Sequence, residues 1–97
     1  MPAIHYTIRW PDDSEARCYS PSLIVQELLE TGREYPLAEF MDLVRRATAI
    51  ANDRVQARYG FFCSRASDQL DRFETEARQF AGIADARVRV LSFTPAD

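Results

Sequence analysis

Hydrophobic and polar residues alternate at the start of the chain, in the segment "AIHYTIRW" that spans residues 3–10. One side of this segment carries Ile4, Tyr6, Ile8 and Trp10. The opposite side carries His5, Thr7 and Arg9. This alternation predicts a half-buried β-strand. The next residues, "PDDS", have the composition of a turn, and "EARCYS" at 15–20 then returns with Ala16 and Cys18 on one face. The pattern therefore predicts a β-hairpin.

The middle of the chain changes to a helical period. A long helix is predicted from Leu37 to Arg58, because apolar residues recur every three or four positions on one face. These residues are Phe40, Val44, Ala47, Ala51 and Val55. Gly60 is expected to end this helix, since glycine adopts the left-handed conformation found at helix C-termini. A second helix is predicted from Ser64 to Phe80, with Ala66, Leu70, Phe73 and Ala77 as its apolar stripe.

The segment between the hairpin and the long helix has two interpretations. "SPSLIVQELLETG" is predicted to form a short helix, with Ser20 as its cap, Pro21 at its first position and Gly32 at its end. The continuous apolar run at 23–25 instead allows an extended segment. Residues 30–36 are expected to form a loop.

Near the other end, "ARVRVLSF" at 86–93 alternates again, with Val88 and Val90 between arginines, and predicts a final strand. The order strand, strand, helix, helix, strand predicts one α+β domain over residues 1–97. In this two-layer fold the N-terminal hairpin and the C-terminal strand form a small sheet packed against two main helices. We expect the last strand to pair with the first. The other face of so small a sheet is expected to be open or covered by a partner, which makes a homodimer an option.

Composition limits the classes of function. The 97 residues are 46% hydrophobic and carry a net charge of −3, as in an ordinary globular domain. Since no apolar run approaches the ~20 residues that span a bilayer, and no signal peptide is visible, we expect a cytoplasmic protein without membrane contact. All twelve basic residues are arginines that alternate with acids, so nucleic acid is not an expected partner.

Cys63 is the candidate for a reactive group. It stands where the second helix is predicted to begin, and a helix N-terminus can lower the pKa of a thiol. Its neighbours Phe61 and Phe62 indicate an apolar junction instead, where burial would raise the pKa. The sequence favours packing over catalysis here. With two separated cysteines and a single histidine, no zinc site and no cofactor are predicted.

The remaining candidates are ligand-binding residues. Ser20 and Ser22 place hydroxyls around a helix start, where anions can bind, although capping explains them equally. Tyr19, Tyr35 and Tyr59 each adjoin a break in the pattern and either line one groove or anchor loops through their hydroxyls. Ser64 completes the set.

Catalytic and metal sites are disfavoured. His5 is interpreted as a surface histidine, and the acids in "PDDSE" are interpreted as turn residues rather than metal ligands. The sequence contains no Ser-His-Asp order and no glycine-rich phosphate loop, so an independent enzyme is not the expected function.

Three blocks of the chain carry a family resemblance. "RWPDDSEARCYSPSLIV", "YPLAEF" and "RVQARYGFFCSRASDQL" resemble the small bacterial nitrogen-starvation-response proteins that are encoded in clusters with a nitrilase. The resemblance extends from about Ile4 to Phe93. One departure is Asp13, where a glycine is more usual. The family pattern retains Trp10, Pro11, Tyr19, Ser20, Pro21, Ser22, Tyr35, Pro36, Tyr59, Gly60, Cys63 and Ser64.

The resemblance implies a context rather than a mechanism. Such clusters also encode a flavoprotein, a radical-SAM enzyme, an acetyltransferase and a synthetase-like protein, and are associated with nitrogen scavenging, including growth on nitriles or cyanide. No catalytic residue is carried over. We therefore expect a non-enzymatic accessory or regulatory protein that binds an enzyme of the same cluster or a small metabolite. The alternatives are a small enzyme or carrier acting through Cys63, and a structural homodimer subunit.

Overall fold

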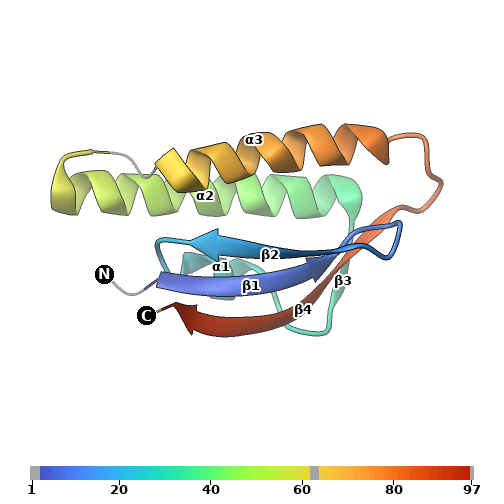
Figure 1. Ribbon diagram of the computed structural model, residues 1–97, viewed down its shortest axis with the longest axis horizontal. Helices are drawn as coiled ribbons and strands as arrows, with labels where there is room; N and C mark the ends of the chain where they lie inside the picture. Colours follow the sequence, from blue (N-terminus) through green and yellow to red (C-terminus); the bar gives the residue numbers. More distant parts are fainter. Residues whose placement is uncertain (1–2, 62–63, 97) are drawn as a thin grey trace.

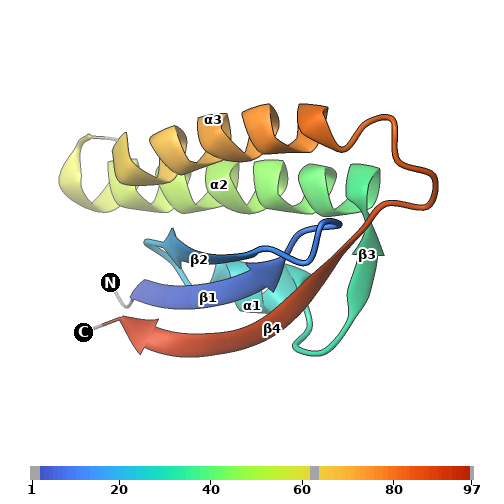
Figure 2. The same cartoon turned by 45° about the vertical axis from the view of Figure 1, so that its right-hand side comes forward.

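A computed structural model of the protein describes residues 3–61 and 64–96, and these residues form two layers. The lower layer in Figure 1 is an antiparallel sheet, and the upper layer consists of two long helices that lie side by side along it. Figure 2, turned by 45°, shows the same layering. The elements in order are β1 (Ala3–Arg9), β2 (Glu15–Ser20), α1 (Ile24–Leu28), β3 (Glu34–Pro36), α2 (Leu37–Tyr59), α3 (Ser64–Gln79) and β4 (Arg87–Ala96). The predicted α+β class is confirmed.

The sheet has the strand order β2-β1-β4-β3, so the first and last strands are its two central members. The predicted hairpin is confirmed, because β1 pairs with β2 and Tyr6 faces Cys18. The predicted pairing of the last strand with the first is also confirmed, since Ile8 faces Val90. A register shift follows, because Thr7 faces Ser92 and Leu91 is thus an extra residue on β4.

Residues 34–36 correct the sequence interpretation, which assigned 30–36 to a loop. They form the short strand β3 on the outer side of β4, with Tyr35 buried opposite Val88. Gly32 has a φ of 84° and donates its backbone N–H to the carbonyl of Val90 at 2.7 Å. A strand of three residues is too short to show alternation, and its partner lies far away in the sequence, so the pattern could not reveal it.

The predicted bounds of the short helix were also wrong. Helix α1 begins at Ile24 rather than after Ser20, and it ends at Leu28 rather than at Gly32. The hydroxyl of Ser20 donates to the carbonyl of Ser22 at 2.6 Å, which forms a turn before the helix. The prediction failed because serine and proline serve turns as readily as helix starts.

The helical layer follows the predicted pattern. All five apolar residues predicted to line one face of α2 are buried, and Gly60 ends the helix with a φ of 82°.

The core between the layers contains an aromatic cluster around Trp10. Its indole ring stacks on Phe80 at 5.7 Å between centroids and meets Phe40 and Phe73 edge-on at 5.9 and 5.6 Å. Such rings bury large apolar areas and fix the geometry between sheet and helices.

The outer edge of β2 is closed by a side chain. Gln69 of α3, only 7% exposed, accepts a hydrogen bond from the backbone N–H of Tyr19 at 2.7 Å. The amide of Gln69 also donates to the carbonyl of Tyr19 at 2.8 Å. The glutamine thus takes the place of a neighbouring strand at Tyr19, whose outward-facing backbone N–H and carbonyl it satisfies. No helix among residues 3–61 and 64–96 is both long and apolar enough to cross a membrane.

Candidate functional site

A row of four charged side chains crosses the face of the sheet that the helices leave uncovered. The row begins with Glu15 on β2, continues through Arg9 on β1 and Arg89 on β4, and ends with Glu34 on β3. Each residue directly faces the next one in the register. Alternation explains the row, because the neighbours of these residues, such as Ile8 and Val90, point into the core. Two arginines are therefore held side by side in the middle of the sheet.

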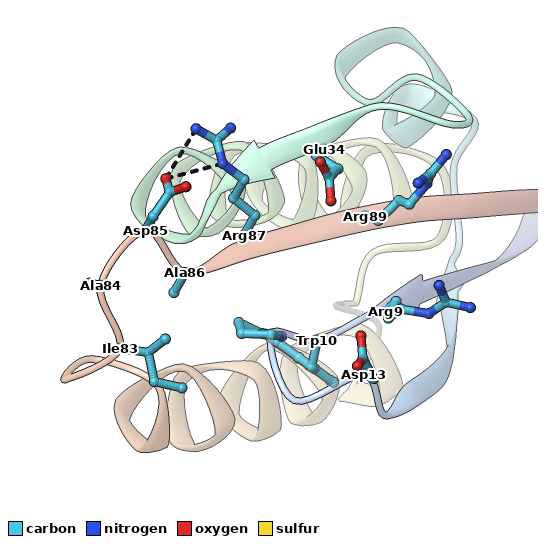
Figure 3. Close-up of a pocket in the computed structure, with 11 residues that line it drawn as sticks. Arg9, Trp10, Asp13, Glu34, Ile83, Ala84, Asp85, Ala86, Arg87 and Arg89 are labelled. Atoms are coloured by element: carbon cyan, nitrogen blue, oxygen red, sulfur yellow. Dashed lines mark hydrogen bonds and ion pairs between the residues drawn. The ribbon is translucent and has the colours of Figure 1, made fainter.

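A cleft of about 370 Å³ opens beside these arginines. Its walls are Arg9 and Trp10 at the end of β1, Asp13 in the hairpin turn, Glu34 on β3 and most of the segment 83–89. Figure 3 shows that these side chains come from three separate parts of the chain and surround the start of β4. The cleft therefore exists only because β1, β3 and β4 are adjacent.

The charges of the cleft are only partly paired within the protein. Arg9 forms an ion pair with Glu15 at 3.2 Å, and Arg87 forms one with Asp85 at 3.1 Å. The Nε atom of Arg9 is buried and has no hydrogen-bond partner in the described part of the chain. Within residues 3–61 and 64–96, no acidic oxygen lies within 4 Å of the Arg89 guanidinium. Arg89 therefore offers hydrogen-bond donors without an acidic partner, and an anionic group in the cleft could accept hydrogen bonds from them.

Trp10 joins the cleft to the core. It is 4% exposed, and its ring belongs to the aromatic cluster beneath the helices. It is also the single tryptophan of the sequence. Any molecule that enters the cleft approaches this residue, so its fluorescence reports on the site.

The two serines predicted to bind ligands have structural roles. Ser20 and Ser22 are both buried, and the hydroxyl of Ser22 accepts hydrogen bonds from the N–H of Ile24 at 3.3 Å and from Arg54 at 2.9 Å. The second bond links α2 to the turn that precedes α1. Ser64 is exposed and is the first residue of α3.

The structure does not bring the three predicted tyrosines together. Tyr19 lies on the edge strand β2, with the guanidinium of Arg65 at 4.0 Å over its ring. Tyr35 lies on the opposite edge strand, where its buried hydroxyl accepts a hydrogen bond from the backbone N–H of Glu30 at 2.8 Å. Tyr59 is the last residue of α2 and is 50% exposed. Tyr35 thus anchors a loop, and no common groove forms.

The predicted thiol cannot be placed, because Cys63 lies outside the described residues. Cys18 can be placed, and burial raises the pKa of its thiol to about 12. A thiol with this pKa remains protonated at neutral pH and is a poor nucleophile. Cys18 is therefore a packing residue of the core.

The hairpin turn behaves as the sequence predicted. Asp12 accepts hydrogen bonds from the hydroxyl and the backbone N–H of Ser14, and the hydroxyl bond is the main reason that the pKa of Asp12 is lowered. Asp13 adopts a left-handed φ of 68°.

In the part of the chain that the structure describes, no three His, Cys, Asp or Glu side chains gather in a way that could hold a metal ion.

The residues of the cleft were not among the predicted ligand-binding residues. The pattern did assign Arg9 and Arg89 to the polar sides of their strands. It could not show that these two positions face each other, because that depends on the register between strands at opposite ends of the chain.

Comparison with known families gives a clear result. The family described as nitrogen starvation-induced protein NitG matches residues 5–93, which is nearly the whole chain. The chain therefore belongs to this family. No curated protein and no solved structure matches it.

Proposed function

We propose that this member of the nitrogen starvation-induced protein NitG family is a non-enzymatic accessory or regulatory protein that binds a small charged metabolite in the cleft beside Arg9 and Arg89. The observation that carries the proposal is the direct opposition of these two arginines at the cleft. A volume of about 370 Å³ lies within the range of small-molecule sites.

The arginine pair supports binding on energetic grounds. Side chains that face each other across two strands have Cβ atoms about 4.5–5.5 Å apart, and like charges at such positions are destabilising. Glu15 neutralises Arg9 from one side. A ligand carboxylate would neutralise Arg89 from the other side, and guanidinium groups bind carboxylates through two parallel hydrogen bonds.

The proposal also includes a cellular setting. The protein would act in the cytoplasm, in nitrogen scavenging from nitriles or cyanide, and would report the bound metabolite to an enzyme encoded in the same cluster. Support for the starvation context comes from the family. A binding protein of this kind changes its partner's activity only when the cleft is occupied, which makes the proposal testable in two steps.

The first step is a ligand screen that uses Trp10 fluorescence and thermal unfolding. The probes are small carboxylates, amines and amino acids at one ionic strength. At least one probe should bind wild-type protein, and Arg89→Gln should weaken that binding by tenfold or more. The control is Arg17→Gln, because Arg17 is an exposed arginine on β2 that does not line the cleft. Equal weakening by both variants, or no binding by any probe, would contradict the proposal.

The second step addresses the non-enzymatic role and the partner. The bound probe should be recovered unchanged after incubation, as measured by mass spectrometry. Purified nitrilase-cluster enzymes should co-purify with the wild-type protein or change in activity when the occupied protein is added. A probe consumed during incubation would instead indicate an enzyme.

A further inference from the structure

We infer that the cleft takes a zwitterion, namely an α-amino acid or a close analogue that carries a carboxylate and an ammonium group on the same carbon. This inference rests on the proposed function, because it names the ligand class of the same cleft. It goes beyond the arginine pair and draws on the acidic and apolar residues around it.

The charges that line the cleft are balanced. Arginines contribute three positive charges, from Arg9, Arg87 and Arg89. Acids contribute three negative charges, from Asp13, Glu34 and Asp85. A purely anionic ligand would meet three carboxylates, and a purely cationic one would meet three guanidinium groups. A ligand that carries both charges can satisfy both sets.

The unpaired charges are of both signs. Arg87 and Asp85 neutralise each other at 3.1 Å. In contrast, none of Arg89, Asp13 and Glu34 has an oppositely charged group within 4 Å in the described part of the chain. Arg89 thus offers donors to a carboxylate, while Asp13 and Glu34 offer acceptors to an ammonium group.

Two of the unpaired groups, Arg89 and Glu34, lie on neighbouring strands. In Figure 3 the guanidinium groups of Arg9 and Arg89 extend to the same side of the cleft, and Glu34 and Asp13 lie on either side of the start of β4. Arg89 and Glu34 face each other in the register of β3 and β4, yet they form no ion pair. Neighbouring donors and acceptors are therefore available to two groups attached to one carbon.

The remaining wall is apolar and suits a side chain. Ile83, Ala84 and Ala86 line the cleft on the segment that leads into β4, and Ile83 is 47% exposed despite its size. An aliphatic ligand side chain would cover Ile83 and remove its apolar surface from water.

The experiment compares matched probes by calorimetry and Trp10 fluorescence. The twenty protein amino acids are screened first, together with norvaline, pentanoate and butylamine, which share one aliphatic chain and differ in their charged groups. For the amino acid that binds best, its deaminated acid and decarboxylated amine are then measured. We expect the amino acid to bind at least tenfold more tightly than either analogue.

Variants separate the two ends of the ligand. Glu34→Gln should weaken binding of the amino acid by about fivefold or more and should not weaken binding of the deaminated acid, whereas Arg89→Gln should weaken binding of both. The matched control is Glu39→Gln, since Glu39 is exposed on α2 and does not line the cleft. An acid or amine that binds as tightly as the amino acid would refute the inference that the ligand is a zwitterion, but it would not contradict the proposed function. If no probe binds here but another carboxylate or amine binds in the wider screen, only the zwitterionic ligand is refuted, and if neither screen gives binding, both the inference and the proposed function are refuted.

Discussion

Replacing Gln69 with leucine tests whether a side chain closes the edge of the sheet. Leucine has a similar size and a similar helix propensity, so α3 itself should be unaffected. The substitution removes both hydrogen bonds to Tyr19, the one accepted at 2.7 Å and the one donated at 2.8 Å. The backbone N–H and carbonyl of Tyr19 then lose their partner at a half-buried position.

The expected cost follows from these two groups. A buried polar group left without a partner costs about 1–3 kcal/mol. Because Tyr19 is half-buried and water can reach part of its backbone, the lower half of that range applies to each group. With about 1–2 kcal/mol for each of the two groups, the total loss should be about 2–4 kcal/mol. The free energy of unfolding of a domain of ordinary stability is about 5–15 kcal/mol.

Urea unfolding of Gln69→Leu should show this loss, and hydrogen exchange should show faster exchange of the Tyr19 amide. The control is Gln79→Leu, which alters an exposed glutamine at the end of the same helix and should change stability by less than about 0.5 kcal/mol. If the two variants are equally stable, or if the Tyr19 amide keeps its protection, the edge-closing role is refuted.

Three further predictions concern single residues. Burial raises the pKa of Cys18 to about 12, so iodoacetamide at pH 8 should alkylate Cys18 only as fast as the protein unfolds. Alkylation of the folded protein at the rate of a free thiol would contradict this prediction. Gly60→Ala should lower the free energy of unfolding in urea by about 1 kcal/mol, because the backbone φ of Gly60 is 82°. Gly82→Ala should leave the free energy of unfolding unchanged, since φ at Gly82 is not positive. Equal losses of stability in the two variants would contradict this reasoning. The hydrogen bonds from Arg45 lower the pKa of Glu74, so this pair stabilises the fold above the unfolded pKa of about 4.3 and loses that contribution as the pH falls through the lower folded value. Glu74→Gln should therefore cost less than about 1 kcal/mol at pH 7 and nothing at pH 2, and a constant cost at both pH values would disprove the linkage.

The parts of the fold with a long periodic pattern could be predicted from the sequence. The alternation around Ile8 and the helical stripe around Val44 each extend over several residues, so chance matches are rare. The strand around Tyr35 and the start of α1 depend instead on a partner strand and on serine hydrogen bonds. Neither leaves a periodic signal in the sequence.

The site was predictable only in part, for a related reason. The family pattern drew attention to Trp10, which does line the cleft, and to Ser20 and Tyr35, which stabilise turns and loops. The opposition of Arg9 and Arg89 arises from tertiary register. A single sequence indicates which face of a strand a residue occupies but not which residue stands opposite.

The central position of β1 has a consequence for how the protein folds. Its hairpin with β2 and the pairing of α2 with α3 involve neighbours in the sequence, so both can form early and quickly. The contact between β1 and β4 joins distant segments, and its loop-closure entropy must be overcome late in the reaction. During synthesis the sheet would therefore remain incomplete until β4 has left the ribosome. Until then, β1 would lack its partner strand at Ile8 and along the rest of that side.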